Sequence, residues 1–177
     1  MPEPLALIAG WARTAVAPHG GAFRTLQAHD IAAPVVQALL QRAGLSAQAV
    51  DAVVLGNALG AGGNPARMVA LAAGLPDRCA ALSVDTQCCS GLDAIAMGVG
   101  LLASGQAQVV IAGGVEAWSR APIRQLRPMH PGHQQRHGLR DQEIPILDHA
   151  VLQGHGGFGR GGRHRGGDVV GQRQLAD

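Results

Sequence analysis

Short apolar runs alternate with segments of helical periodicity along the first two thirds of the chain. Four runs of four or five mostly apolar residues, bounded by glycine or polar residues, predict strands over 5–9, 52–56, 80–84 and 109–112. These runs are largely unbroken rather than alternating apolar and polar. That pattern is typical of strands that are covered on both faces of a sheet.

Three helices are predicted between these strands. The first follows Asp30, a residue suited to a helix N-cap, and ends at Gly44 with its apolar residues on one face. The second has Pro65 in its first turn and runs to about residue 73, and the third covers 88–103. The order β-α-β-α-β-α-β predicts an α/β fold with helices on both faces of the sheet.

The third predicted helix is apolar around most of its circumference, with Asp93 as its only charged residue. A helix that lies on one sheet keeps a polar outer face, so this one is predicted to be buried on all sides between two sheets. A four-stranded unit supplies only one sheet. The pattern therefore predicts a second half or a partner chain.

The character of the chain changes after about Pro128, where periodicity is lost and glycine, arginine and histidine accumulate. We predict a folded unit over 1–128 and a mostly irregular tail over 129–177, in which only 144–152 has a modest apolar pattern. A GC-rich gene read in a shifted frame is also rich in these three residue types. Out-of-frame translation of the tail is therefore a hypothesis, which the other two reading frames of the gene would test.

The composition narrows the class of protein. Hydrophobic residues make up 47% and charged residues 15%, which is typical of a folded chain with a core. The net charge of +2 gives no electrostatic reason to expect nucleic acid or an anionic membrane as a partner. The chain has no apolar run of ~20 residues and no basic leader of a signal peptide. Its three cysteines make no disulfide framework, so we expect a cytoplasmic protein.

Candidate chemistry centres on the segment SVDTQCCSGLDAI, which puts Cys88 between a predicted strand and a predicted helix. The free amides and the positive end of a helix dipole favour a thiolate at such a place, by at most ~2 kcal/mol. Full activation of the nucleophile also requires a nearby base. Gly91 allows the backbone to pack tightly, and the amides of the turn around Cys89 and Ser90 are candidates for stabilising an oxyanion.

The residues alone leave two alternatives open. Free cysteine is among the most buried residue types, so a structural thiol at position 88 is the more common role. Cys89 competes as the nucleophile: inside a helix its side chain points about 100° away from that of Cys88, and composition does not choose between them. A disulfide between these adjacent cysteines is not expected in a reducing compartment.

Four segments, in the same order along the chain, resemble the thiolase family. In the nucleophile segment Cys88 is followed by Cys89 at a small-residue position and then by Ser90 and Gly91. Asp85 departs from the family, which often has Asn three residues before the nucleophile. The other three segments are ARTAVAPHGGAF at 12–23, VLGNALGAGGNPARMVALAAGLP at 54–76 and GGVEAWSRAP at 113–122. The resemblance covers roughly residues 5–127 and is to the N-terminal half of a thiolase.

This resemblance implies one half of a five-layer αβαβα sandwich with buried central helices. It also implies an acyl-CoA acyltransferase, in which Cys88 accepts the acyl group of a coenzyme A thioester. The acyl-enzyme then passes the group to CoA or to the enolate of acetyl-CoA. We accordingly expect acyl-CoA and CoA as substrates and no bound cofactor. A homo-oligomer, or association with a thiolase C-terminal half, is also expected.

Two catalytic groups of the family are absent from this sequence. Thiolases take an activating His and a second, acid/base Cys from Gly-His-Pro and Cys-x-Gly-Gly segments of the C-terminal half, and neither segment occurs here. Cys79 lies beside a predicted strand and is expected to be a packing residue. The alternative to an active acyltransferase is therefore a truncated, inactive fragment or a subunit completed by another chain.

Weaker patterns lead to ordinary explanations. No set of histidines has the compact spacing of a metal site, because Pro131 and Gly132 interrupt the spacing of His130, His133 and His137, so no metal is expected. The run GRGGRHRGG resembles an RGG-type RNA-binding segment but has no folded module beside it, so a solvated tail is expected.

Two features near the resembling segments also have structural explanations. The glycine-rich loop 57–64 lacks the Lys and Ser/Thr of a phosphate-binding P-loop, so a structural loop is expected. Glu116 is either an acid that supports the site or a satisfied polar group at a strand end.

Overall fold

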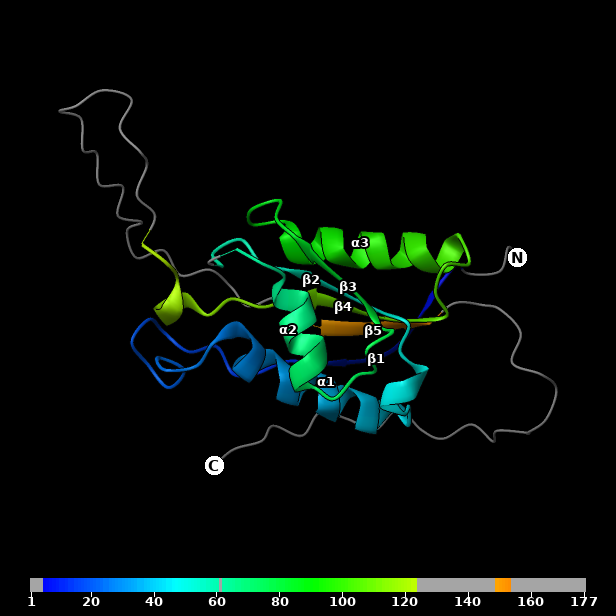
Figure 1. Cartoon of the computed structure of the whole chain (residues 1–177), viewed down its shortest axis with the longest axis horizontal. Coiled ribbons are helices and arrows are strands. Elements are labelled where there is room, and N and C mark those ends of the chain that lie inside the picture. The colour runs from blue at the N-terminus through cyan, green and yellow to red at the C-terminus, as the bar shows by residue number, and fades with distance from the viewer. Residues whose placement is uncertain (1–4, 61, 124–148, 154–177) are drawn as a thin grey trace, which may run out of the picture.

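A computed structural model of the chain describes residues 5–60, 62–123 and 149–153. These residues form three layers, with one mixed sheet between helices (Figure 1). Helix α3 (Ser90–Ala103) covers one face of the sheet, whereas α1 (Ala28–Ala43) and α2 (Pro65–Ala72) lie together on the other. The predicted α/β fold with helices on both faces is confirmed.

The sheet has five strands in the order β1-β5-β4-β2-β3. Strands β2 and β3 are parallel neighbours, and β4 pairs in parallel with the other edge of β2. Strand β5 runs antiparallel to both β4 and β1. The strand bounds are β1 Leu7–Ala12, β2 Ala52–Gly56, β3 Ala80–Val84, β4 Val109–Gly114 and β5 His149–Gln153.

The three parallel strands β2, β3 and β4 follow the sequence prediction closely, and the edge strand β1 does not. Strands β2 and β3 have the predicted bounds, and β4 extends two residues further through Gly113 and Gly114. Strand β1 begins later than the predicted 5–9, because its pairing with β5 sets its register, with a bulge between Ile8 and Gly10. Long-range pairing of this kind leaves no local pattern in the sequence.

Strand β5 lies within the segment that was predicted to be mostly irregular. It fills the place between β1 and β4, so the prediction of four strands is corrected to five. It overlaps the modest apolar pattern at 144–152, which was too weak by itself to indicate a strand. The rest of the predicted tail, including its histidines and its glycine- and arginine-rich run, lies outside the described residues.

Helix α1, Ala28–Ala43, begins earlier than predicted because Asp30 caps it differently. Asp30 is the third helical residue rather than the N-cap, and its carboxylate accepts the Gln27 backbone N–H at 2.9 Å. This reciprocal arrangement with Gln27 is a capping box. The predicted end is confirmed, since Gly44 terminates the helix with φ of 65°, a left-handed conformation that glycine adopts without steric cost.

Helix α2, Pro65–Ala72, has Pro65 at its first position, as predicted. Asn64 caps it by accepting the Arg67 backbone N–H at 3.1 Å, and also accepts the Ser83 hydroxyl at 2.7 Å. Ser83 in turn accepts the Ala66 backbone N–H at 3.0 Å. These bonds fix the start of α2 against the end of β3.

The apolar core divides into two clusters, one on each face of the sheet. Strand residues that alternate in direction, such as Val53 and Val54, supply opposite clusters. The larger cluster contains α1 and α2 side chains such as Leu39 and Val69, which are completely buried. The smaller cluster lies beneath helix α3, Ser90–Ala103, and includes its residue Leu102.

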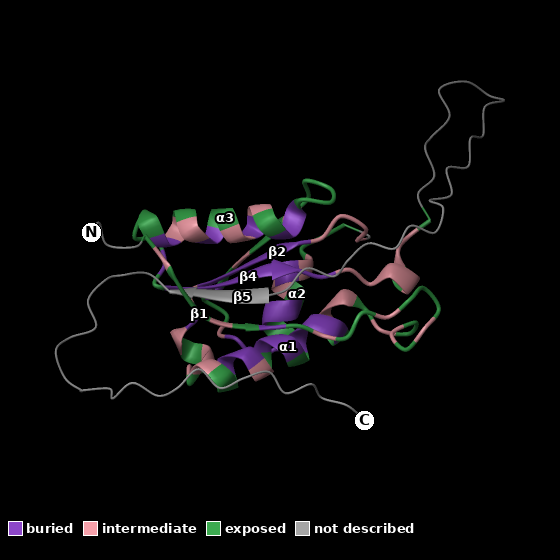
Figure 2. Cartoon of the chain, turned by 180° about the vertical axis from the view of Figure 1, so that it is seen from behind, coloured by how far each residue is buried: buried purple, intermediate pink, exposed green. Residues whose placement is uncertain are grey.

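Helix α3 is not buried on all sides in this part of the chain, so that prediction is wrong for the described residues. Its sheet face is largely buried, whereas its outer face is largely exposed (Figure 2). Among its large apolar residues, Leu92 is 65% and Met97 is 42% exposed. The described residues form a single sheet, and only one face of a helix can pack against one sheet. The outer face of α3 is consequently an exposed surface of apolar side chains.

No helix among the described residues has the length and apolar character needed to cross a bilayer. Within the same residues no three or more His, Cys, Asp or Glu side chains gather into a cluster that could hold a metal ion.

Candidate active site at the start of helix α3

Cys88 lies in the turn between β3 and α3, at the carboxyl end of the parallel part of the sheet. Helix α3 begins at Ser90 with Cys89 as its N-cap, two residues after the predicted start. Neither Cys88 nor Cys89 is therefore inside the helix, and the predicted 100° separation of their side chains does not apply. Cys88 is the residue immediately before the cap, where the first-turn amides of a helix remain available.

The residue before Cys88 has a strained backbone. Gln87 has φ of 59°, and it is the only residue other than glycine with positive φ among those described. For a residue with a Cβ this conformation costs ~1–3 kcal/mol, and it persists only where surrounding contacts hold the residue in place. Asp85 holds Gln87 by two hydrogen bonds. Its Oδ1 accepts one from the Gln87 backbone N–H at 3.0 Å and one from the Gln87 side-chain Nε2–H at 3.1 Å.

Ser90 closes the same turn from the other side. Its hydroxyl accepts the Thr86 backbone N–H at 2.9 Å and donates to the Gln87 carbonyl at 2.6 Å. The Ser90 backbone N–H also donates to the Gln87 carbonyl, at 3.1 Å. Ser90 is only 5% exposed, and a buried hydroxyl with both bonds satisfied is well placed to rigidify a turn. The predicted residue Ser90 thus holds the turn that contains Cys88.

The start of α3 packs directly against the end of β2. A Cβ added to Gly56 would lie 2.5 Å from the carbonyl carbon of Ser90 and 2.6 Å from the backbone nitrogen of Gly91. No other residue type fits there unless the backbone shifts. Gly91 is itself buried, which agrees with its predicted role in tight backbone packing.

The three thiols lie in two kinds of environment, exposed and buried. Cys88 and Cys89 are exposed, whereas Cys79 is buried in the larger apolar cluster with 2% of its surface accessible. Burial raises the pKa of the Cys79 thiol, and nearby Asp51 raises it further, although Arg67 and Arg78 oppose this change. Cys79 is therefore a packing residue, as its place beside β3 predicted.

This difference predicts the outcome of a thiol titration. We expect a chromogenic disulfide reagent at neutral pH to modify two thiols per native chain quickly and Cys79 only after denaturation. The raised pKa of Cys79 keeps it protonated, and the thiolate is the reactive form. The same raised pKa means that its contribution to stability is lost as the pH rises above the usual thiol range. Three fast thiols in the native chain would contradict this assignment.

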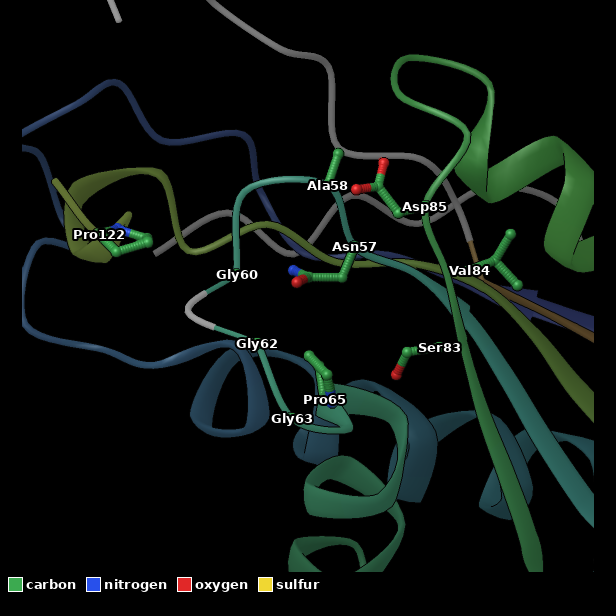
Figure 3. Close-up of a pocket in the computed structure, with 10 residues that line it drawn as sticks. All are labelled: Asn57, Ala58, Gly60, Gly62, Gly63, Pro65, Ser83, Val84, Asp85 and Pro122. Atoms are coloured by element: carbon green, nitrogen blue, oxygen red, sulfur yellow. The ribbon is translucent and has the colours of Figure 1, made fainter. Parts of the chain in front are cut away.

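A pocket of about 480 Å³ opens next to this turn, at the carboxyl ends of β2 and β3. Asn57 and Ser83 point into it from the two strand ends, and Asp85 lies on its rim (Figure 3). Gly60 and Pro65 line the side formed by the loop before α2. Open α/β sheets bind ligands in crevices at the carboxyl ends of their strands.

The carboxylate of Glu116 holds the glycine-rich loop in place. It accepts the backbone N–H of Ala58 and of Leu59, and the Asn57 side-chain amide at 3.1 Å. Asn57 also donates to the Val115 carbonyl at 2.8 Å, which ties the ends of β2 and β4 together. These bonds agree with the second of the two roles predicted for Glu116, a hydrogen-bonded polar group at a strand end, rather than an acid that supports the site. The bonds from the backbone of Ala58 and Leu59 to Glu116 likewise agree with a structural role for the glycine-rich loop.

Sequence reasoning identified Cys88, Cys89, Ser90 and Gly91, and the structure brings all four to one turn. It missed the contributions of Asp85 and Gly56. In the sequence Asp85 stands out only as a departure from the family pattern, although an Asp side chain that bonds the backbone two residues on is a known turn-forming arrangement. Gly56 gave no signal beyond ending a predicted strand, because its contact with Ser90 joins positions 34 residues apart.

Comparison with known proteins adds the family relationship. The family model described as "Thiolase, N-terminal domain" matches residues 6–155. Several similar proteins are named acetyl-CoA acetyltransferase, and two of them illustrate the match. That of Rhizobium meliloti (strain 1021) is 40% identical over 156 residues, covering 87% of this chain and 38% of that protein. That of Shinella zoogloeoides is 44% identical over 124 residues, covering 69% of this chain and 31% of that protein.

A solved structure agrees with these matches. The crystal structure of the Bacillus anthracis acetyl-CoA acetyltransferase superposes with a TM-score of 0.67 and 35% sequence identity, covering 77% of this chain and 35% of that one. The chain thus spans about a third of the length of the curated relatives that it matches. The family match extends to residue 155 and so includes β5.

Proposed function

Because the chain belongs to the thiolase family, whose N-terminal domain it matches, we propose that it carries the nucleophile of a thiolase-type acyl-CoA acyltransferase. In this proposal Cys88 accepts the acyl group of a coenzyme A thioester and holds it as an acyl-enzyme. Acetyl-CoA is the first substrate to test, since acetyl-CoA acetyltransferases are among the relatives.

The single observation that carries the proposal is the turn between β3 and α3. It places the exposed Cys88 thiol just before the N-terminus of α3. The preceding residue, Gln87, has a left-handed conformation that hydrogen bonds hold in place. The turn lies at the edge of the sheet where α/β proteins bind ligands, and a pocket opens beside it. The positive end of α3 favours negative charge on sulfur and on an oxyanion.

The proposed step forms one bond and breaks one. The Cys88 thiolate attacks the carbonyl carbon of the thioester, and the electron pair of the carbonyl moves to oxygen. The bond from carbon to the CoA sulfur then breaks, leaving acyl-Cys88 and the CoA thiolate, which takes a proton from solvent. The backbone amides of Cys89 and Gly91 are the groups proposed to support the oxyanion, whereas the Ser90 N–H donates to the Gln87 carbonyl and supports the turn.

Acetyl labelling tests the proposal. The purified chain is incubated with acetyl-CoA over hours, and the acetylated peptide is mapped by mass spectrometry and by its lability to hydroxylamine. We expect one acetyl group, on Cys88, formed slowly because the sequence lacks the family's activating His segment. Cys88→Ala should abolish the label.

Cys89→Ala is the matched control, because Cys89 is an adjacent, exposed thiol of the same type. It should keep most of the label of the unsubstituted chain. A label that disappears in Cys89→Ala and persists in Cys88→Ala would move the nucleophile to Cys89. An absence of label in both cysteine variants and in the unsubstituted chain would refute acyl transfer.

A second proposal is that the chain acts as a non-catalytic remnant, or as a subunit completed by a thiolase C-terminal half or by another copy. The observation that favours it is the exposed apolar face of α3, which includes Leu92 and Met97. Each 100 Å² of apolar surface left in water forfeits about 2.5 kcal/mol, so cover for this face would be favourable. The turnover experiment in the Discussion separates the two proposals.

A further inference from the structure

Beyond the nucleophile itself, we propose that Asp85 is a positioning residue for Cys88. In this proposal its carboxylate clamps Gln87 in the left-handed conformation and so sets the direction in which the chain enters Cys88. The inference rests on the proposed function of Cys88. Its evidence is different, because it consists of the contacts between Asp85 and Gln87, which precede the nucleophile in the chain.

The clamp consists of two local hydrogen bonds to one carboxylate oxygen. Asp85 Oδ1 accepts both the backbone N–H and the side-chain Nε2 of Gln87, at 3.0 and 3.1 Å. The first bond holds the peptide that determines the φ angle of Gln87, and the second holds its side chain over the same carboxylate. Both bonds need only an acceptor oxygen at position 85.

The remaining contacts of the turn do not replace this clamp. Ser90 fixes the carbonyl of Gln87 and the N–H of Thr86, and the Thr86 hydroxyl donates to Asp93 Oδ2. These bonds hold the two ends of the turn. The N–H and side chain of Gln87 itself are held by Asp85. A left-handed residue with a Cβ costs ~1–3 kcal/mol, so loss of its support should shift Gln87 toward ordinary backbone conformations.

The consequence is measurable without enzyme turnover. Iodoacetamide alkylates Cys88 and Cys89 in the same sample, and mass spectrometry gives a rate constant for each. Cys89, the N-cap of α3 and one residue further from Gln87, serves as the internal reference. If Asp85 positions Cys88, its removal should lower the ratio of the Cys88 rate to the Cys89 rate by roughly five- to tenfold, the shift expected for ~1 kcal/mol or slightly more.

Three variants test the clamp. Asp85→Asn keeps an acceptor oxygen and should keep the rate ratio within about twofold of the unsubstituted chain. Asp85→Ala removes both bonds and should show the full loss. The double variant Asp85→Ala with Gln87→Gly should recover the ratio, because glycine adopts positive φ without needing a clamp. A general loosening of the fold would not be repaired by adding a glycine.

An unchanged ratio in Asp85→Ala, or a failure of the double variant to recover it, would overturn the proposal. If circular dichroism shows that Asp85→Ala does not fold, the double variant is compared with Gln87→Gly alone. The two should then have equal ratios of the Cys88 to the Cys89 alkylation rate. A lower ratio in the double variant would contradict the clamp. Acetyl mapping on the unsubstituted chain runs in parallel. A label away from Cys88 would refute the proposed function, whereas the alkylation ratio would still decide the clamp.

Discussion

Gly56→Ala is expected to destabilise the domain by about 3 kcal/mol and to lower its melting temperature by roughly 10 °C. The new methyl carbon would lie 2.5 Å from the Ser90 carbonyl carbon and 2.6 Å from the Gly91 nitrogen. These are backbone atoms of a buried helix start, so they cannot rotate away as the end of a flexible side chain would. Folded domains are stable by only ~5–15 kcal/mol, so this is a large part of the total.

The same substitution should also disturb the candidate site, because Ser90 closes the turn before α3. Thermal unfolding followed by circular dichroism measures the stability, and alkylation of Cys88 measures the effect on the site. Gly100→Ala is the matched control: it lies in the same helix, a Cβ there meets no atom within 4 Å, and alanine favours the helix by about 1 kcal/mol. Equal melting temperatures for Gly56→Ala and the unsubstituted chain would contradict the close packing.

The second large effect concerns turnover. The 177-residue chain alone is expected to transfer at most about one acetyl group per molecule and to show no sustained thiolysis of acetoacetyl-CoA. General acid and base groups contribute typically ~10²–10⁴-fold each, and the sequence lacks the family segments that supply the His and the second Cys. A spectrophotometric assay of thioester cleavage, with a full-length relative as the reference, measures the difference.

Sustained turnover by the purified chain alone, at a rate near that of the reference enzyme, would show that another group supplies the base. Adding the separately produced C-terminal part of a relative separates the two candidate functions. Recovery of turnover, dependent on Cys88, would support a subunit that is completed by another chain. Continued inactivity, with a stoichiometric acetyl label still on Cys88, would support a domain that retains the nucleophile without the full catalytic cycle.

Local sequence patterns determined much of this fold. The mostly apolar runs identified β2 and β3 within their observed bounds, because short runs of aliphatic residues bounded by glycine or polar residues have few alternatives. Pro65 and Gly44 marked a helix start and a helix end, since their backbone preferences act within one turn. The order of four short segments also indicated the family and, within it, Cys88 as the candidate nucleophile.

Other features were decided by contacts between distant parts of the chain. The insertion of β5 between β1 and β4 depends on pairing with β1, which lies more than 100 residues away along the chain, and the contact of Gly56 with Ser90 spans 34 residues. Neither leaves a periodic signal, because periodicity reports which face of an element is apolar and not what lies against it. The apolar outer face of α3 shows the same division. Its apolar sequence predicted a helix buried on all sides. The tertiary structure of the described residues buries only the face of α3 that packs against the sheet.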